Sequence, residues 1–271
     1  MTSIAATRST GRDQIAPTAP VRPMLASQTR AQFRAFWRLP SMSATTLLIP
    51  LMLFVFFVLP HAREPMQGQV TVGAYMLAAI GAYAAGSVMV FNFGVTVALD
   101  RGQKVDLLMR AAPLPGWLYL AARIIAALLF AVLAVGALFV IAIVVGGIRL
   151  DVLVWLDLAG RLVAGVIPFL LLGFAIAYLA GPSAAPAVAN LLFIGMAFAS
   201  GMLVRLDQMP GFLRVVAPVL PTYHYAQFAW NALGVGDESV WVSGAWLIAY
   251  AVALFALAAF AYRREGQRRF A

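Results

Sequence analysis

Charged residues are absent from five long stretches of this 271-residue chain, and all five stretches are strongly apolar. The stretches are 39–62, 65–99, 124–148, 162–204 and 239–262. An α-helix needs about 20 apolar residues to cross the hydrocarbon core of a bilayer, so each stretch is long enough for at least one crossing. The pattern therefore predicts an integral membrane protein.

The stretch 162–204 is too long for a single span and contains a natural break. Gly181, Pro182 and Pro186 fall near its middle, and proline interrupts a helix. Splitting the stretch there gives six predicted transmembrane helices in a bundle over 41–262. They are 43–60, 71–97, 124–147, 162–180, 187–204 and 241–261. Only helices and closed barrels span bilayers, and these runs lack the alternation of barrel strands. The fold class is therefore an all-α membrane protein.

The basic residues predict the orientation of this bundle. If both termini are cytoplasmic, the inner segments hold fourteen of the nineteen Lys and Arg residues, including those of the basic tail 263–271. Cytoplasmic segments of membrane proteins carry such an excess. The expected location is thus the cytoplasmic (inner) membrane. The net charge of +9 then reflects topology and contact with anionic membrane lipid, and nucleic acid is not an expected partner.

The chain before the first span divides into two parts. Residues 1–24 are rich in Thr, Ser, Pro and Gly, which predicts a disordered cytoplasmic tail. Residues 25–40 instead have the pattern of an amphipathic helix that lies in the membrane interface and ends at Pro40. Its faces carry Arg30, Arg34 and Arg38 on one side, and Phe33, Phe36 and Trp37 on another. A plain membrane anchor and a contact with a partner protein both fit this pattern.

The loop at 100–123, between the second and third predicted spans, combines an apolar ridge with a charged rim. The charged residues are Asp100, Arg101, Lys104, Asp106 and Arg110, and the apolar ones are Val105, Leu107, Leu108 and Met109. Pro113 and Pro115 then end any helix. A peripheral partner could bind such a short helix, although an ordinary solvated loop fits as well.

The connection before the last span, 205–239, is too apolar for a free loop. It is also too short and too rich in proline to cross the membrane and return. Two short helices that dip into the outer leaflet, broken at Pro218 and Pro221, fit this composition. The alternative is an interfacial cap packed on the bundle.

Four features, in this order, resemble an ABC transporter permease of the type-2 exporter family over residues 25–265. They are the Arg/aromatic helix 25–39, the loop DRGQKVDLLMRAAPLP at 100–115, the segment MPGFLRVVAPVLPTYHYAQ at 209–227 and the Arg-rich C-terminus. The segment LPTYHYAQ is also similar to the drug- and antibiotic-exporting branch.

This resemblance implies export, driven by two ABC ATPase subunits bound to two permeases, of which the second is another copy or a homologous chain. The loop would be a coupling helix inserted into the ATPase, and the helix 25–39 would be a second contact. The implied ATPase-coupling residues are Asp100, Arg101, Gln103, Lys104, Leu107, Leu108, Arg110 and Pro113.

Enzymatic chemistry has little support in this chain. Its one lysine, Lys104, follows Gln103 and not glycine, which excludes the GxxxxGK[ST] phosphate loop. ATP and Mg²⁺ would therefore be bound by the partner ATPase, and no cofactor or catalytic residue is expected here. The chain has no cysteine and only two histidines, so no metal site is expected either.

Two other classes of function compete with the exporter. An ion-coupled secondary transporter usually places an ionisable group inside a span, and none of the six predicted spans has one. A scaffold protein would not need the amphipathic loop. The absence of intramembrane charge favours an apolar, amphiphilic or lipid-linked substrate. The candidate residues for its route are Tyr83, Phe91, Asn92, Phe93 and Asn190, although Asn92 could equally bond a neighbouring helix.

Overall fold

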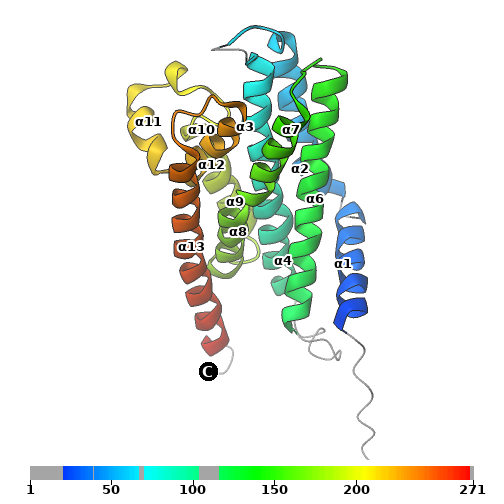
Figure 1. The fold of residues 1–271 in the computed structure, drawn as a ribbon. Coiled ribbons are helices and arrows are strands. Elements are labelled where there is room, and N and C mark those ends of the chain that lie inside the picture. Colours follow the sequence, from blue (N-terminus) through cyan, green and yellow to red (C-terminus); the bar gives the residue numbers. More distant parts are fainter. Residues whose placement is uncertain (1–20, 39, 67–69, 104–115, 269–271) are drawn as a thin grey trace, which may run out of the picture.

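The computed structural model describes residues 21–38, 40–66, 70–103 and 116–268. Over these residues the chain is helical and forms no strand beyond one isolated bridge between Pro65 and Thr71. The helices form an elongated bundle (Figure 1). The prediction of an all-α fold is confirmed.

Within the described residues, four helices are long and apolar enough to cross a membrane. They are Val72–Gly102, Gly116–Val144, Val152–Leu179 and Val240–Arg264. The first is continuous through α3 (Val72–Ser87), the π-helix η3 (Val88–Val95) and α4 (Thr96–Gly102). The second is α6 (Gly116–Val144), the third joins α7 (Val152–Ala164) to α8 (Ile167–Leu179), and the fourth lies in α13 (Val240–Arg268). They correspond to predicted spans two, three, four and six.

The other two predicted spans correspond to shorter apolar helices, Thr46–His61 and Ala185–Ala199. The first of them combines most of α2 (Pro40–Leu53) with η1 (Phe54–Val58) and η2 (Leu59–His61). The second combines α9 (Ala185–Ala189), the π-helix η4 (Asn190–Ile194) and α10 (Gly195–Ala199). A bundle of six spans therefore stays a prediction.

Several predicted boundaries differ from the structure, among them the start of α6, which lies at Gly116 and not at residue 124. Helix α1 (Val21–Arg38) starts before residue 25, since Pro23 in the first turn costs no hydrogen bond. Helix α7 starts at Val152, well before the predicted residue 162, because Arg161 pairs with Asp157 one turn away at 2.8 Å. Helix α13 continues to Arg268, through most of the predicted basic tail.

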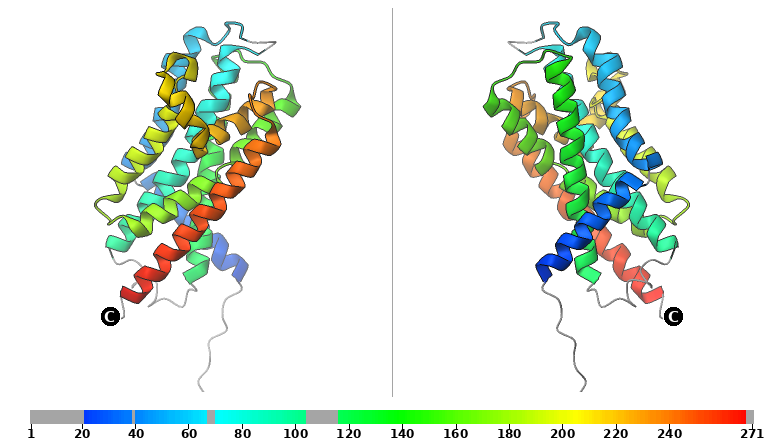
Figure 2. Two further views of the ribbon diagram at one scale, coloured as in Figure 1. Left: turned by 90° about the vertical axis from the view of Figure 1, so that its left-hand side faces the viewer. Right: turned by 90° about the vertical axis from the view of Figure 1, so that its right-hand side faces the viewer.

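The helix Val72–Gly102 forms the centre of the bundle (Figures 1 and 2), with 83% of its most apolar window buried. Its small residues allow this burial, as is usual where membrane helices approach closely. A Cβ atom added to Gly94 would lie 2.5 Å from the Cα of Gly173 in α8, so the two backbones touch. One added to Gly86 would meet Phe193. The small-residue face is therefore used within the subunit.

The connection before α13 contains the two expected short helices, α11 (Gly211–Val216) and α12 (Pro221–Trp230), joined by η6 (Ala217–Val219). Helix α12 is packed onto the bundle: the Tyr225 hydroxyl donates to the Leu162 carbonyl at 2.5 Å, and Trp230 Nε1 donates to the Tyr75 carbonyl at 3.0 Å. In contrast, α11 exposes Phe212 and Val215. The structure thus favours a packed cap for α12, and a dip into the membrane stays a prediction for α11.

Candidate functional site

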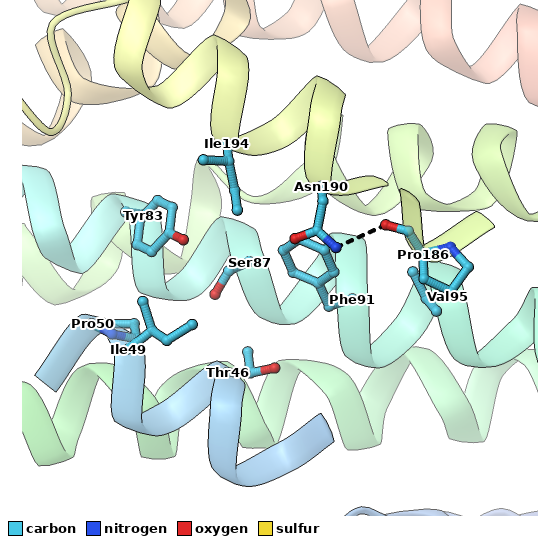
Figure 3. A pocket seen from close by; sticks show the side chains of 10 residues that line it. All are labelled: Thr46, Ile49, Pro50, Tyr83, Ser87, Phe91, Val95, Pro186, Asn190 and Ile194. Carbon is cyan, nitrogen blue, oxygen red and sulfur yellow. Dashed lines mark hydrogen bonds between the residues drawn. The ribbon is translucent and has the colours of Figure 1, made fainter. Parts of the chain in front are cut away.

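A largely apolar groove lies between α2, the α3–η3 helix and the α9–η4 helix (Figure 3), with a volume of about 170 Å³. On two of its walls, the lining residues are spaced four positions apart in the sequence, and this spacing keeps their side chains on one face of each helix. The lining residues are Tyr83, Ser87, Phe91 and Val95 from the central helix, Pro186, Asn190 and Ile194 from the second, and Thr46, Ile49 and Pro50 from α2.

Both regular walls contain a π-helical stretch, η3 or η4. A π-helical turn closes i→i+5 hydrogen bonds and is frequent at functional sites. A π-helical turn contains more residues than an α-helical turn. In a helix that combines both, side chains spaced four residues apart therefore stay closer to one line along the helix than they would in a purely α-helical segment. The π-helical stretches therefore explain why long four-residue stripes can face one groove.

The polar atoms of the groove are largely bonded within the protein. Ser87 Oγ donates to the Ala84 carbonyl at 2.8 Å, and Asn190 Nδ2 donates to the Pro186 carbonyl at 2.9 Å (Figure 3). Thr46 Oγ1 donates to Asn92 Oδ1 at 3.2 Å. No charged side chain is among the lining residues. The groove therefore suits an uncharged, mainly apolar group.

An aromatic cluster around Phe193 stands behind the groove. The Phe193 ring lies 5.5 Å from Tyr83, 6.1 Å from Phe91 and 5.7 Å from Phe169, measured between ring centroids. Phe193 is fully buried. The cluster holds the central helix against the second wall, so the shape of the groove depends on ring packing.

The structure brings together three of the five residues predicted for the substrate route: Tyr83, Phe91 and Asn190. Asn92 is buried one position away and bonds Thr46 of α2, which is the helix-bridging alternative. Phe93 faces α8, where its ring stacks on Phe174 at 6.2 Å. Sequence reasoning missed the contribution of α2, although the interval of four from Tyr83 to Val95 was a usable signal for the central wall.

The predicted ATPase-coupling residues are only partly described. Lys104, Leu107, Leu108, Arg110 and Pro113 lie outside the described residues, so their assignment stays a prediction. Gln103 is exposed. Asp100 and Arg101 instead contact other helices of the same chain: Asp100 accepts a hydrogen bond from Tyr119 at 2.9 Å, and Arg101 donates to the Ala177 carbonyl.

The predicted amphipathic helix is α1, which lies along α6 (Figure 1). Phe33 and Phe36 pack on Phe130 of α6, with ring centroids 6.3 and 5.5 Å apart. The arginine face is exposed, with Arg30, Arg34 and Arg38 all on it. The side chain of Trp37 lies outside the described residues. The two faces are thus separated as expected, and a position in the membrane interface stays a prediction.

A polar cluster surrounds His224 in α12, at the end of the bundle opposite to the start of α1. His224 Nδ1 lies 2.9 Å from Glu238 Oε2, and Nε2 lies 2.8 Å from the Pro218 carbonyl. Its ring stacks on Trp246 of α13 at 5.1 Å. Burial and the nearby carboxylate of Glu238 raise the pKa of Tyr223. The described residues contain no group of three or more metal-ligating side chains.

Comparison with known proteins identifies the family of this groove-containing bundle. The sequence pattern described as "ABC-2 type transporter" matches residues 25–232, most of the chain. This chain belongs to that family. It is also 24% identical, over 242 residues, to the "Putative transport permease YvfS" of Bacillus subtilis (strain 168), a match that covers 89% of this chain and 98% of that protein. The resemblance drawn from the sequence is confirmed.

Family membership establishes the general role of this chain. This ABC-2 chain is a membrane-embedded, multi-pass transport permease subunit of an ABC transporter. Membership also implies that it associates with an ABC ATPase.

Proposed function

We propose that this permease exports an apolar or amphiphilic substrate, such as a drug, a lipid or a lipid-linked glycan, using ATP hydrolysed by a separate subunit. The observation that carries this proposal is the uncharged groove along the central helix, whose polar side chains are largely bonded within the protein. An ion-coupled transporter would need an ionisable group on such a route, and the groove lining has none.

The proposed assembly contains two permeases, either two copies of this chain or one copy and a homologue, with two ATPase subunits that bind ATP and Mg²⁺. The proposed location is the inner membrane with both termini cytoplasmic. In support, α1 begins, α4 ends, α6 begins and α13 ends at one end of the bundle (Figure 1). Helix α1, which begins at that end, carries the exposed residues Arg30 and Arg34, and anionic lipid would attract them.

Cysteine labelling tests the orientation, since the native chain has no cysteine to interfere. Arg8→Cys and Arg268→Cys are expected to react with a membrane-impermeant maleimide only after cells are opened. Arg63→Cys and Asp237→Cys, both at exposed positions, are expected to react in intact cells. Reaction of the first pair in intact cells would reverse the proposed orientation.

The coupling assignment is tested by the double substitution Leu107→Asp and Leu108→Asp. An apolar anchor at an interface centre carries about 2 kcal/mol or more, so we expect co-purification of the ATPase to fall sharply while membrane insertion is unchanged. The measurements are the yield of an ABC ATPase, identified by mass spectrometry, and ATP hydrolysis by the purified complex.

The matched control for this test replaces both leucines by methionine, which keeps the apolar surface. It is expected to retain the ATPase, and the purified permease alone is expected to hydrolyse no ATP. Parental amounts of ATPase on the double-aspartate variant would contradict the assignment of this segment.

A further inference from the structure

The ends of α4 and α6 are joined by an ionic cluster around one carboxylate. Tyr119 and Arg123 are one helical turn apart on α6, so they share a face, and both donate hydrogen bonds to Asp100 Oδ2 of α4. Arg123 also donates to the Tyr119 hydroxyl. Three side chains from two helices therefore form a closed set of contacts.

Arg123 is buried in this cluster, with only 3% of its surface exposed. A buried charge is costly unless it is paired and hydrogen-bonded, and Asp100 supplies the pairing carboxylate. Removing one partner of such a pair leaves the other charge uncompensated. Substituting only one of the two charged residues is therefore expected to weaken the contact between α4 and α6.

The next residue, Arg101, connects the same helix end to a different neighbour. It donates to the Ala177 carbonyl near the C-terminus of α8, where a positive charge is favourable. Its guanidinium also lies over the Tyr178 ring, 4.3 Å from the centroid. Tyr178 in turn contacts Tyr262 of α13, with 5.4 Å between ring centroids. Two consecutive residues thus tie α4 to α6 on one side and to α8 and α13 on the other.

We propose that Asp100, Arg101, Tyr119 and Arg123 form a stem clasp that makes the ends of α4 and α6 move as one body. Asp100 and Arg101 are then positioning residues and not contacts with the ATPase, which reverses the role that sequence reasoning assigned to them. The clasp passes a displacement at these helix ends to α6, α8 and α13. Its link to ATP hydrolysis rests on the proposed function, whereas the joining of the helix ends does not.

Spin labels test directly whether the ends of α4 and α6 are held together. Gln103→Cys at the end of α4 and Trp117→Cys at the start of α6 are both at exposed positions, and the chain has no other cysteine. Pulsed electron paramagnetic resonance on the purified full-length permease should give a narrow distance distribution. Asp100→Asn and Arg123→Gln should each broaden it, and Tyr119→Phe, which keeps the ion pair, should broaden it less.

The matched control is Asp157→Asn, which breaks another Asp–Arg pair of this chain, in α7, and should leave the distribution narrow. Asp100→Asn with an unchanged distribution and only a lowered melting temperature would overturn the clasp, because the pair would then be merely stabilising. Where Asp100→Asn fails to fold, Arg123→Gln decides by the same criterion, because it removes the other partner of the ion pair.

The complex with the ATPase tests the role in transmission. Asp100→Asn should retain the ATPase at the parental level but reduce the stimulation of ATP hydrolysis by the assembled permease about tenfold, within the range of measured coupling between sites. Loss of the ATPase together with a narrow distance distribution would make Asp100 a contact residue and overturn the proposal. Failure of any ABC ATPase to associate with the parent chain would instead refute the proposed function, and the distance measurements would stand.

Discussion

Gly94→Ala is expected to prevent the permease from folding stably. The added Cβ would lie 2.5 Å from Gly173 Cα and 2.7 Å from the Gly173 carbonyl oxygen. These are backbone atoms of α8, so no side-chain rotation can relieve the contact. Overpacking in a closely packed core costs about 1–3 kcal/mol and sometimes more, and here two central helices must separate. We expect the melting temperature of the purified protein to fall strongly, with little monodisperse material recovered.

The control is Gly136→Ala in α6, where nothing lies within 4 Å of the added Cβ. Since alanine favours a helix over glycine by about 1 kcal/mol, this variant should be as stable as the parent or slightly more so. Gly173→Ala should behave like Gly94→Ala, because its Cβ would lie 2.7 Å from the Met89 carbonyl oxygen. Parental stability of Gly94→Ala would show that the two backbones are further apart than in the structure.

The apolar stretches predicted the helices because burial in a membrane or a core removes charge from long segments. The same rule misplaced the start of α7. The predicted span began at 162, after the last charged residue, but Asp157 and Arg161 are an i,i+4 pair that offset each other's charge within a helix. The start of α1 was missed for a similar reason, since Pro23 was read as a feature of the tail. Sequence therefore predicted helix existence better than helix ends.

The sequence predicted only some of the residues that line the groove. Tyr83, Phe91 and Asn190 attracted notice as aromatic or polar residues within spans, whereas Thr46 did not, and Pro186 was noted only as a helix break. Contacts between segments that are distant in the sequence, such as Gly94 with Gly173, decide which helices lie side by side. The periodicity of a single segment does not indicate such contacts. The inward position of Asp100 was hidden for the same reason, because its partner Arg123 is on another helix.

One continuous helix, Val72–Gly102, connects the two parts of the proposed mechanism. Its stripe from Tyr83 to Val95 forms a wall of the groove, and Asp100 near its end belongs to the stem clasp. A rigid helix that is displaced at one end also moves along its length. A displacement at the stem clasp would therefore change the width of the groove, which gives ATP hydrolysis by a partner a direct route to the proposed substrate path.

His224→Ala is expected to destabilise the opposite end of the bundle by about 3 kcal/mol, the cost of removing one partner from a buried pair. The Pro218 carbonyl can only accept, so His224 Nε2 carries a proton and donates to it at 2.8 Å. Nδ1 lies 2.9 Å from Glu238 Oε2. Alanine would remove the donor to the Pro218 carbonyl, would leave Glu238 Oε2 with only Ser243 Oγ as a partner at 3.3 Å, and would remove the ring that stacks on Trp246.

The second histidine of the chain provides the matched control. His61 lies 4.0 Å from Glu64, and both side chains are more than half exposed, so His61→Ala should change stability by less than about 1 kcal/mol. Thermal melting of the purified permease measures both variants under one condition. Because α12 joins α13 to the bundle through the His224 contacts, His224→Ala should also increase hydrogen exchange in 217–239. Equal melting temperatures for the two variants would show that the buried pair contributes no more than the exposed one.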